Sequence, residues 1–146
     1  MKKFISTFVA LAVTASFAMA AAGWDDDYDK AIAKAKAEKK LVLLDFTGSD
    51  WCGWCIKLDK DVFSKKEFKD FAKDNLVLVE VDFPQAKKLA KKTEKQNEDL
   101  KNKFRVQGYP TLVMLDADGK EVHRIGGYSE TALDDLKKAV AAHKPK

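Results

Sequence analysis

The sequence predicts an α/β fold in which a central mixed β-sheet is flanked by helices on both faces. Short apolar runs of strand length alternate with longer stretches of helix-forming residues along the chain. The last two strand candidates are joined by Asp116-Ala117-Asp118-Gly119, a hairpin turn signal, so this pair runs antiparallel. The 146 residues suffice for one domain with a sizeable core and are too few for two domains of ordinary size.

The first twenty residues differ in character from the rest of the chain. Two lysines precede an uncharged, apolar-rich stretch over residues 4–17, and Ala18-Met19-Ala20 has the small-x-small pattern that a signal peptidase cleaves. The apolar stretch is short of the roughly 20 residues needed to span a bilayer. We therefore expect a signal peptide over residues 1–20, cleaved after Ala20, and a periplasmic or secreted domain over residues 21–146. Cleavage after Ala22 and an uncleaved anchor helix are the alternatives.

The first elements of this domain are a helix and a buried strand. Residues 28–40 are rich in Ala, Lys and Glu, which favour a helix. Residues 41–46 form an almost continuous apolar run, which is typical of a central strand buried on both faces. Residues 47–50 are turn formers, and the two cysteines of the chain follow directly.

A second helix is predicted to begin at the cysteine pair. Apolar residues follow Cys55 at helical spacing, which places the pair in the first helical turn. Ser64-Lys65-Lys66-Glu67 matches a capping box, a signal for a new helix start. We therefore expect a break near Phe63 and a helix that continues through Phe71.

The second half of the chain supplies three strands and a long helical segment. Residues 76–81 are a second buried strand candidate. Residues 84–104 read as helical, in two pieces, because Thr93-Glu94-Lys95-Gln96 is another capping-box match. Residues 111–115 and 120–125 are the strands on either side of the hairpin turn.

The chain ends in a predicted helix that follows Ser129 as its cap. Its buried stripe is formed by Leu133, Leu136 and Val140. The expected order is therefore helix, strand, helix, strand, helix, strand, strand, helix.

The 27 basic and 23 acidic residues are interspersed, which gives no electrostatic case for binding nucleic acid.

The cysteine pair is the strongest candidate for chemistry. A sulfur in the first turn of a helix faces unpaired backbone N–H groups and the positive end of the helix dipole, which favour the thiolate. Cys52 is then the nucleophile, and Cys55, one turn later and deeper, resolves the mixed disulfide. Gly53 permits the close backbone approach of a tight turn. This pattern predicts reversible dithiol–disulfide exchange, which requires no organic cofactor and no metal.

Other interpretations of the pair stay open. A structural disulfide across so short a loop gains little from loop closure. A zinc site needs four ligands, whereas the chain has no further cysteine, and His123 and His143 lack ligand spacing. Two thiolates could hold a soft metal such as Cu(I). The alternative function is therefore a non-catalytic binding module that captures Cu(I) or binds a client protein.

Three motifs together resemble the thioredoxin superfamily. They are Trp51-Cys52-Gly53-Trp54-Cys55, the following Lys57-Leu58-Asp59 with Val62-Phe63, and Gly108-Tyr109-Pro110-Thr111. From about Lys40 onward the chain is most similar to exported bacterial thioredoxin-like proteins with a WCGWC active site. The resemblance implies a thioredoxin fold and a thiol–disulfide oxidoreductase that acts on exported proteins as a reductase or isomerase.

The resemblance also implies where a substrate binds. It implies a cis Tyr109–Pro110 bond that packs against the sulfurs and presents backbone to an extended substrate, although a trans proline at a strand start is the alternative. Trp51 is expected to pack beside the site. Trp54 stands where ordinary thioredoxins have proline, so it restores a backbone donor and alters the redox potential. The expected substrate-binding residues are Trp51, Gly53, Trp54, Tyr109 and Pro110.

Asp45 is a further catalytic candidate. An acid inside so apolar a run should be partly buried with a raised pKa, and it could accept or relay the proton of Cys55. The resemblance points the same way, although the stretch from Asp45 to Cys52 is one residue longer than in ordinary thioredoxins. A side chain turned to solvent at the strand end is the alternative.

The expected partners follow from this chemistry and from the resemblance. They are cysteine-containing exported proteins and, as electron donor, a membrane thiol transporter. Nucleic acid binding and stable membrane insertion after signal cleavage are not expected.

Overall fold

The computed structural model describes residues 23–145, so the predicted signal peptide lies outside the described residues. A five-stranded sheet has the order β1-β3-β2-β4-β5. Its strands are β1 (Trp24–Asp25), β2 (Leu41–Thr47), β3 (Leu76–Asp82), β4 (Thr111–Leu115) and β5 (Glu121–Gly126). The first three run parallel, whereas β4 is antiparallel to both β2 and β5. The expected mixed sheet with a terminal hairpin is confirmed.

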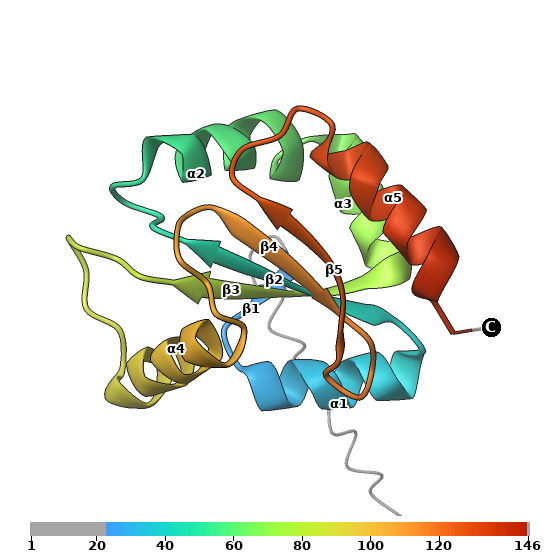
Figure 1. Ribbon diagram of the computed structural model, residues 1–146, viewed down its shortest axis with the longest axis horizontal. Helices are drawn as coiled ribbons and strands as arrows, with labels where there is room; N and C mark the ends of the chain where they lie inside the picture. The colour runs from blue at the N-terminus through green and yellow to red at the C-terminus, as the bar shows by residue number, and fades with distance from the viewer. Residues whose placement is uncertain (1–22, 146) are drawn as a thin grey trace, which may run out of the picture.

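Helices cover both faces of this sheet (Figure 1). One face carries α1 (Tyr28–Glu38) and α4 (Lys91–Lys103), and the other carries α2 (Gly53–Leu58), α3 (Lys66–Asn75) and α5 (Ala132–His143). A π-helical turn, η2 (Asp59–Phe63), joins α2 to the segment before α3. No helix of the described residues is long and apolar enough to cross a membrane.

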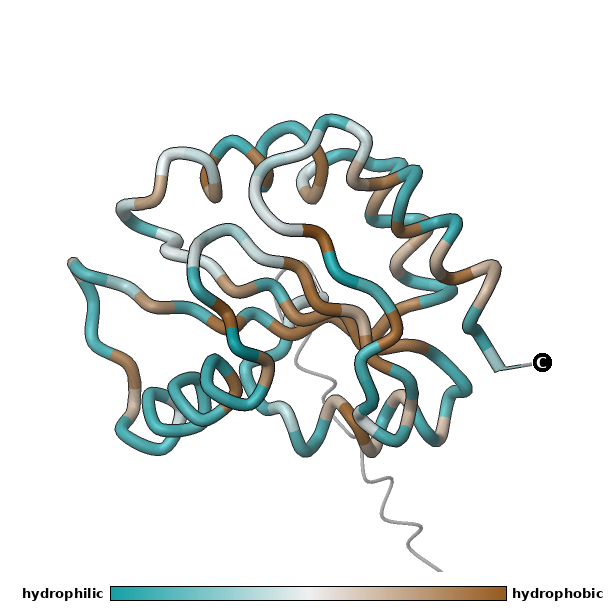
Figure 2. Tube along the Cα trace, in the orientation of Figure 1, coloured by the Kyte–Doolittle hydropathy of each residue, from teal (hydrophilic) through white to brown (hydrophobic). Residues whose placement is uncertain are grey.

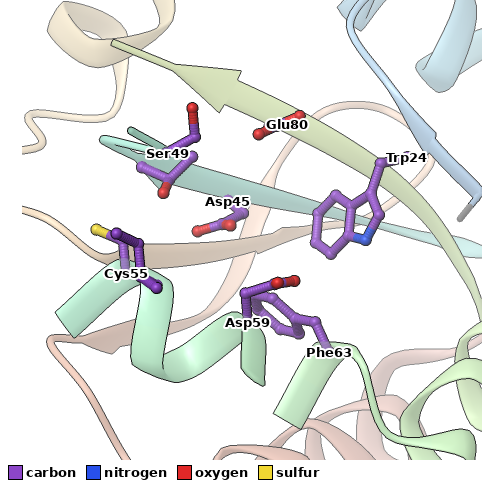
Figure 3. Close-up of a pocket in the computed structure, with 9 residues that line it drawn as sticks. Trp24, Asp45, Ser49, Cys55, Asp59, Phe63 and Glu80 are labelled. Atoms are coloured by element: carbon purple, nitrogen blue, oxygen red, sulfur yellow. The ribbon is translucent and has the colours of Figure 1, made fainter. Parts of the chain in front are cut away.

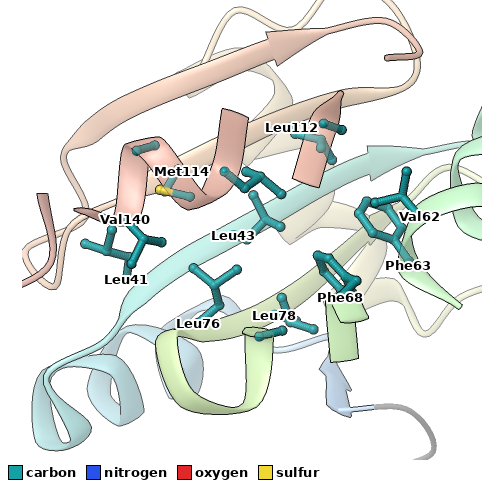
Figure 4. Close-up of a cluster of buried hydrophobic side chains, with 14 of the residues drawn as sticks. Leu41, Leu43, Val62, Phe63, Phe68, Leu76, Leu78, Leu112, Met114 and Val140 are labelled. Carbon is teal, nitrogen blue, oxygen red and sulfur yellow. The ribbon is translucent and has the colours of Figure 1, made fainter. Parts of the chain in front are cut away.

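The central position of β2 in the sheet explains why its sequence is almost uniformly apolar. Leu41 and Leu43 point into the cluster beneath α3 and α5, which Figure 4 shows. Val42 and Leu44 point into the opposite cluster, beneath α1 and α4. Burying each such side chain stabilises the fold by about 1.5–3 kcal/mol. The hydrophobic residues accordingly concentrate along the strands, with polar residues on the outer helices (Figure 2).

The predicted helix over residues 84–104 begins later than expected. Only the part from Lys91 onward is helical, as α4. The preceding segment is held in another conformation, because the backbone N–H groups of Gln85 and Ala86 donate to the Asp50 carboxylate at 2.9 and 2.8 Å. These bonds, led by that of Gln85, hold the pKa of Asp50 below its ordinary value.

Neither capping-box match caps a helix. Ser64 donates to the Asp59 carboxylate at 3.3 Å, and α3 begins after Lys65 without a side-chain cap. Thr93 lies inside the first turn of α4. The Gln96 amide instead anchors the start of α1, since its oxygen accepts from the Tyr28 N–H at 3.0 Å. Long-range partners compete for these polar side chains, which the local pattern does not reveal.

Several smaller boundaries also differ from the sequence prediction. The break near Phe63 is present as the end of η2, and α3 continues to Asn75 rather than ending near Phe71. Ser129 is not the cap of α5, which follows Thr131; its hydroxyl accepts from the Thr131 N–H at 3.2 Å. The two-residue strand β1 was not predicted, because it is too short to form a pattern.

Candidate active site

The cysteine pair lies between the end of β2 and the start of α2. Cys52 is the N-cap of α2, and its sulfur accepts the backbone N–H of Cys55 at 3.3 Å. The two sulfurs form a disulfide, with 5.2 Å between the Cα atoms. Cys52 is 8% exposed and Cys55 is 5% exposed. After reduction, the amide and the helix start would stabilise negative charge on Cys52 more than on Cys55.

The loop before the cysteines is fixed by bonds to the end of β3 and to the segment after it. Ser49 donates to the Asp82 carboxylate through its backbone N–H at 2.9 Å and its hydroxyl at 2.5 Å. The Trp51 indole N–H donates to the Phe83 carbonyl at 2.8 Å. Together with the Asp50 bonds, these contacts hold the loop between β2 and the cysteines. The backbone approach to Cys52 is therefore set by long-range hydrogen bonds.

Glycine is required at a different place from the one expected. A Cβ at Gly53 would meet no other atom within 4 Å, so the turn itself does not need a glycine there. A Cβ at Gly48, by contrast, would collide with the indole of Trp51. The close approach expected at Gly53 thus occurs at Gly48, where the Cys52 N–H donates to the glycine carbonyl at 2.8 Å.

The proline loop lies beside the cysteine motif. The Tyr109–Pro110 peptide bond is cis. Tyr109 stacks on Phe83 at 5.1 Å between ring centroids, and Trp51 meets Tyr109 edge-on at 6.0 Å. The Pro110 carbonyl accepts the Gly127 N–H at 2.8 Å. The loop is thereby held between an aromatic cluster and the end of β5.

An open groove of about 290 Å³ extends from Pro110 toward Trp54 and Tyr128. Trp54 is 60% exposed, and its ring lies 5.4 Å from that of Tyr128. The Tyr128 hydroxyl donates to the Asp61 carboxylate at 2.8 Å, while Lys57 forms an ion pair with Asp61 and lies 4.7 Å from the tyrosine ring. Sequence reasoning missed Tyr128, because only the fold brings this loop to the motif.

A cavity of about 320 Å³ lies on the other side of Cys55, and it is lined by three carboxyl groups (Figure 3). They belong to Asp45 on β2, Asp59 on η2 and Glu80 on β3. The parallel register pairs Asp45 with Glu80 directly. Sequence reasoning found Asp45 but missed the other two, since strand register and helix docking are needed to place them.

Asp45 is buried, and the structure turns it into this cavity rather than to solvent. Its Oδ1 atom has no hydrogen-bond partner among the described residues. Burial raises the pKa of Asp45 well above its ordinary value, and the nearby charges of Glu80, Asp59 and Asp82 raise it further. The structure thus places Asp45 in the same cavity as Cys55. Pro110 and Trp54 line the 290 Å³ groove instead.

The possible metal ligands of the described residues are dispersed over the fold. Within residues 23–145, no group of three or more His, Cys, Asp or Glu side chains is arranged to hold a metal ion. His123 lies on β5 and His143 ends α5. Both histidines therefore occupy separate elements away from the cysteine motif.

Comparisons with known proteins agree with this geometry. A family model described as a thioredoxin-like domain matches residues 28–143. The disulfide bond reductase DsbH of Chlamydia pneumoniae is 43% identical over 101 residues, which are 69% of this chain and 61% of that protein. The thioredoxin-related protein DsbJ of the same organism is 33% identical over 113 residues, 77% of this chain and 32% of its own. This chain thus spans less than two thirds of either relative.

A solved structure described as a DsbH oxidoreductase superposes with a TM-score of 0.75 at 36% sequence identity. The match covers 94% of this chain and 96% of that one. The overlap is therefore nearly complete for both chains.

Proposed function

The chain belongs to the thioredoxin-like domain family, and on this basis we propose that it is a thiol–disulfide oxidoreductase that reduces disulfides in exported proteins. The observation that carries the proposal is the Cys52–Cys55 pair at the start of α2, next to a groove that contains cis Pro110. The preference for reduction is supported by the relative described as a disulfide bond reductase.

The reaction begins at Cys52. In the reduced protein, the Cys52 thiolate attacks one sulfur of a substrate disulfide, and the other substrate sulfur leaves as a thiolate. The Cys55 N–H, which already lies 3.3 Å from the Cys52 sulfur, stabilises the attacking charge. The product is a mixed disulfide between Cys52 and the substrate.

Cys55 completes the exchange. Its thiol loses a proton, its sulfur attacks Cys52, and the second substrate thiol is released as the Cys52–Cys55 disulfide forms. Asp45 accepts the Cys55 proton in this step, directly or through water in the cavity that both residues line. Its raised pKa makes it a stronger base than an ordinary aspartate.

The substrate occupies the groove beside Pro110. Tyr109 and Pro110 present backbone to an extended peptide, and the exposed faces of Trp51 and Trp54 supply apolar contact area. Gly53 leaves space next to Cys52, because a Cβ there would meet no described atom within 4 Å beyond its chain neighbours and the backbone of its own helix. A peptide backbone can approach through this gap.

The location and partners follow from the sequence. The apolar leader and its cleavage pattern support export to the periplasm or the medium. Cysteine-containing exported proteins are the proposed substrates, and a membrane thiol transporter is the proposed electron donor. The chain is also similar to thiol:disulfide interchange proteins DsbD, at 28% to 34% identity. The exchange needs no organic cofactor or metal.

Insulin reduction tests the proposal. With dithiothreitol as electron source, the reduced protein should accelerate insulin precipitation, and Cys52→Ser should lower the rate to that of dithiothreitol alone because the attacking sulfur is lost. Cys55→Ser is the matched variant, since it keeps the attacking sulfur and removes the resolving one. When this variant is reduced, freed of dithiothreitol and then mixed with insulin, it should accumulate a covalent Cys52–insulin complex visible on a non-reducing gel.

Two results would contradict the proposal. One is a wild-type rate no higher than that of dithiothreitol. The other is an unchanged rate in Cys52→Ser. Inactivity combined with tight, stoichiometric Cu(I) binding would favour the alternative binding module.

A further inference from the structure

The acidic cavity behind Cys55 contains one more carboxyl group than the proposed reaction uses. The parallel pairing of β2 with β3 places Glu80 directly beside Asp45, and side chains of paired residues in adjacent strands project to the same face. Both line the cavity, and Asp59 faces them from η2 (Figure 3). Three acids from three elements therefore meet at the resolving cysteine.

Among residues 23–145, no basic side chain lines this cavity to offset the acids. Lys87 lowers the pKa of Glu80, but its ion pair is formed with Asp82, at 3.2 Å. Asp82 is itself bonded to Ser49 and stays a further negative neighbour. Asp45 is buried, Glu80 is half-buried and Asp59 is exposed, so the like charges of the other acids act most strongly against ionisation of Asp45.

The pKa values of Asp45 and Glu80 are both raised by their surroundings. Asp45 is nine-tenths buried, and its Oδ1 has no hydrogen-bond partner within residues 23–145. Burial also raises the pKa of half-buried Glu80; Asp82, Asp59 and Asp26 add to the rise, whereas Lys87 opposes it. A protonated carboxyl beside an ionised one relieves the repulsion, as in other paired carboxyl sites.

We propose that Glu80 is a positioning residue for proton transfer at Cys55: it shares one proton with Asp45 in the cavity, and so sets the pH at which Cys55 is activated. The proposal rests on the exchange reaction above. When Asp45 is ionised, it takes the Cys55 proton, and the Cys55 sulfur attacks Cys52. The Cys52–substrate bond breaks, and the substrate thiolate leaves with the electron pair and is protonated by water. Glu80 touches no reacting atom and acts through Asp45.

A carboxyl titration by carbon NMR tests the shared proton without any substrate. In the oxidised wild-type protein, Asp45 and Glu80 should each report two coupled steps. In Glu80→Gln, which keeps the size and removes the charge, Asp45 should titrate in one step about one pH unit lower. Glu98→Gln, an exposed change on α4, is the matched control and should leave Asp45 unchanged.

The rate of the resolving step tests the consequence for catalysis. Reduced protein mixed with Ellman's reagent releases one thionitrobenzoate when Cys52 attacks and a second when Cys55 attacks. The pH midpoint of the second release should move down by about one unit in Glu80→Gln and should not move in Glu98→Gln. A merely structural role for Glu80 would change amplitude or stability without this shift.

Either of two results would overturn the proposal: an Asp45 titration that is the same in wild type and Glu80→Gln, or a second release whose pH midpoint does not move. Failure of the proposed function looks different. A protein that shows coupled carboxyl titrations but no insulin reduction would contradict the exchange reaction and not the shared proton.

Discussion

Cys52 and Cys55 differ mainly in their immediate surroundings, since both are buried. Cys52 accepts a backbone N–H at the start of α2. Cys55 lines a cavity whose acids oppose a negative charge on its sulfur. Charge is thus favoured on the attacking sulfur and disfavoured on the resolving one. This asymmetry suits a dithiol in which Cys55 is activated only after the mixed disulfide has formed.

At the residue scale, the raised pKa of Asp45 predicts how the free energy of unfolding depends on pH. Its pKa is higher in the folded than in the unfolded chain, so the folded protein binds more protons between the two values and loses stability as pH rises through that window. Asp45→Asn removes this dependence. Its free energy of unfolding relative to wild type should increase with pH above about 4, by at most about 1.4 kcal/mol per pH unit.

Urea unfolding of the oxidised proteins from pH 4 to pH 8 measures this difference. Asp29→Asn, an exposed change on α1, should show a constant difference from wild type over the same range. A difference for Asp45→Asn that does not vary with pH would show that Asp45 titrates normally in the folded chain.

At the scale of elements, the end of β3 and the segment after it support the loop that carries the cysteines. The contacts come from side chains and backbone far apart in sequence: Asp50 binds two amides, Ser49 binds Asp82, and the Trp51 indole binds the Phe83 carbonyl. These hydrogen bonds join segments that are far apart in the sequence, so they exist only in the folded chain. We therefore expect the loop to shift when these hydrogen bonds are removed.

Asp50→Ala tests this support. It leaves the amides of Gln85 and Ala86 without their carboxylate partner, which should lower the free energy of unfolding, because both hydrogen bonds are made to a charged group. Chemical denaturation measures the loss, and insulin reduction should slow in parallel. Asp118→Ala, in the exposed turn before β5, is the control for removing a surface aspartate. Equal stability of the two variants would contradict the supporting role.

At the scale of the whole molecule, the sequence predicts the features that depend on local pattern. The almost continuous apolar run of residues 41–46 predicts the central strand, because both faces of β2 are buried. The position of the cysteines after that run predicts their place at the start of a helix. Hydrophobic pattern and motif position are therefore sufficient for the framework of the site.

The features that the sequence does not predict depend on contacts between distant segments. Glu80 meets Asp45 only through the register of β2 and β3, and Tyr128 reaches Trp54 only through the turn after β5. The non-helical conformation of residues 84–90 likewise depends on Asp50. Local capping and helix patterns carry no information on such partners.

The reduction potential of the Cys52–Cys55 pair tests the central claim, that the whole protein works as a reductase, most directly. Equilibration with glutathione or dithiothreitol buffers, followed by quantification of the free thiols, gives this value. A reductase should have a potential below about −200 mV, toward the roughly −270 mV of thioredoxin. A potential near the approximately −120 mV of a strong oxidant would contradict the claim, because such a pair would donate its disulfide to exported proteins instead of reducing theirs.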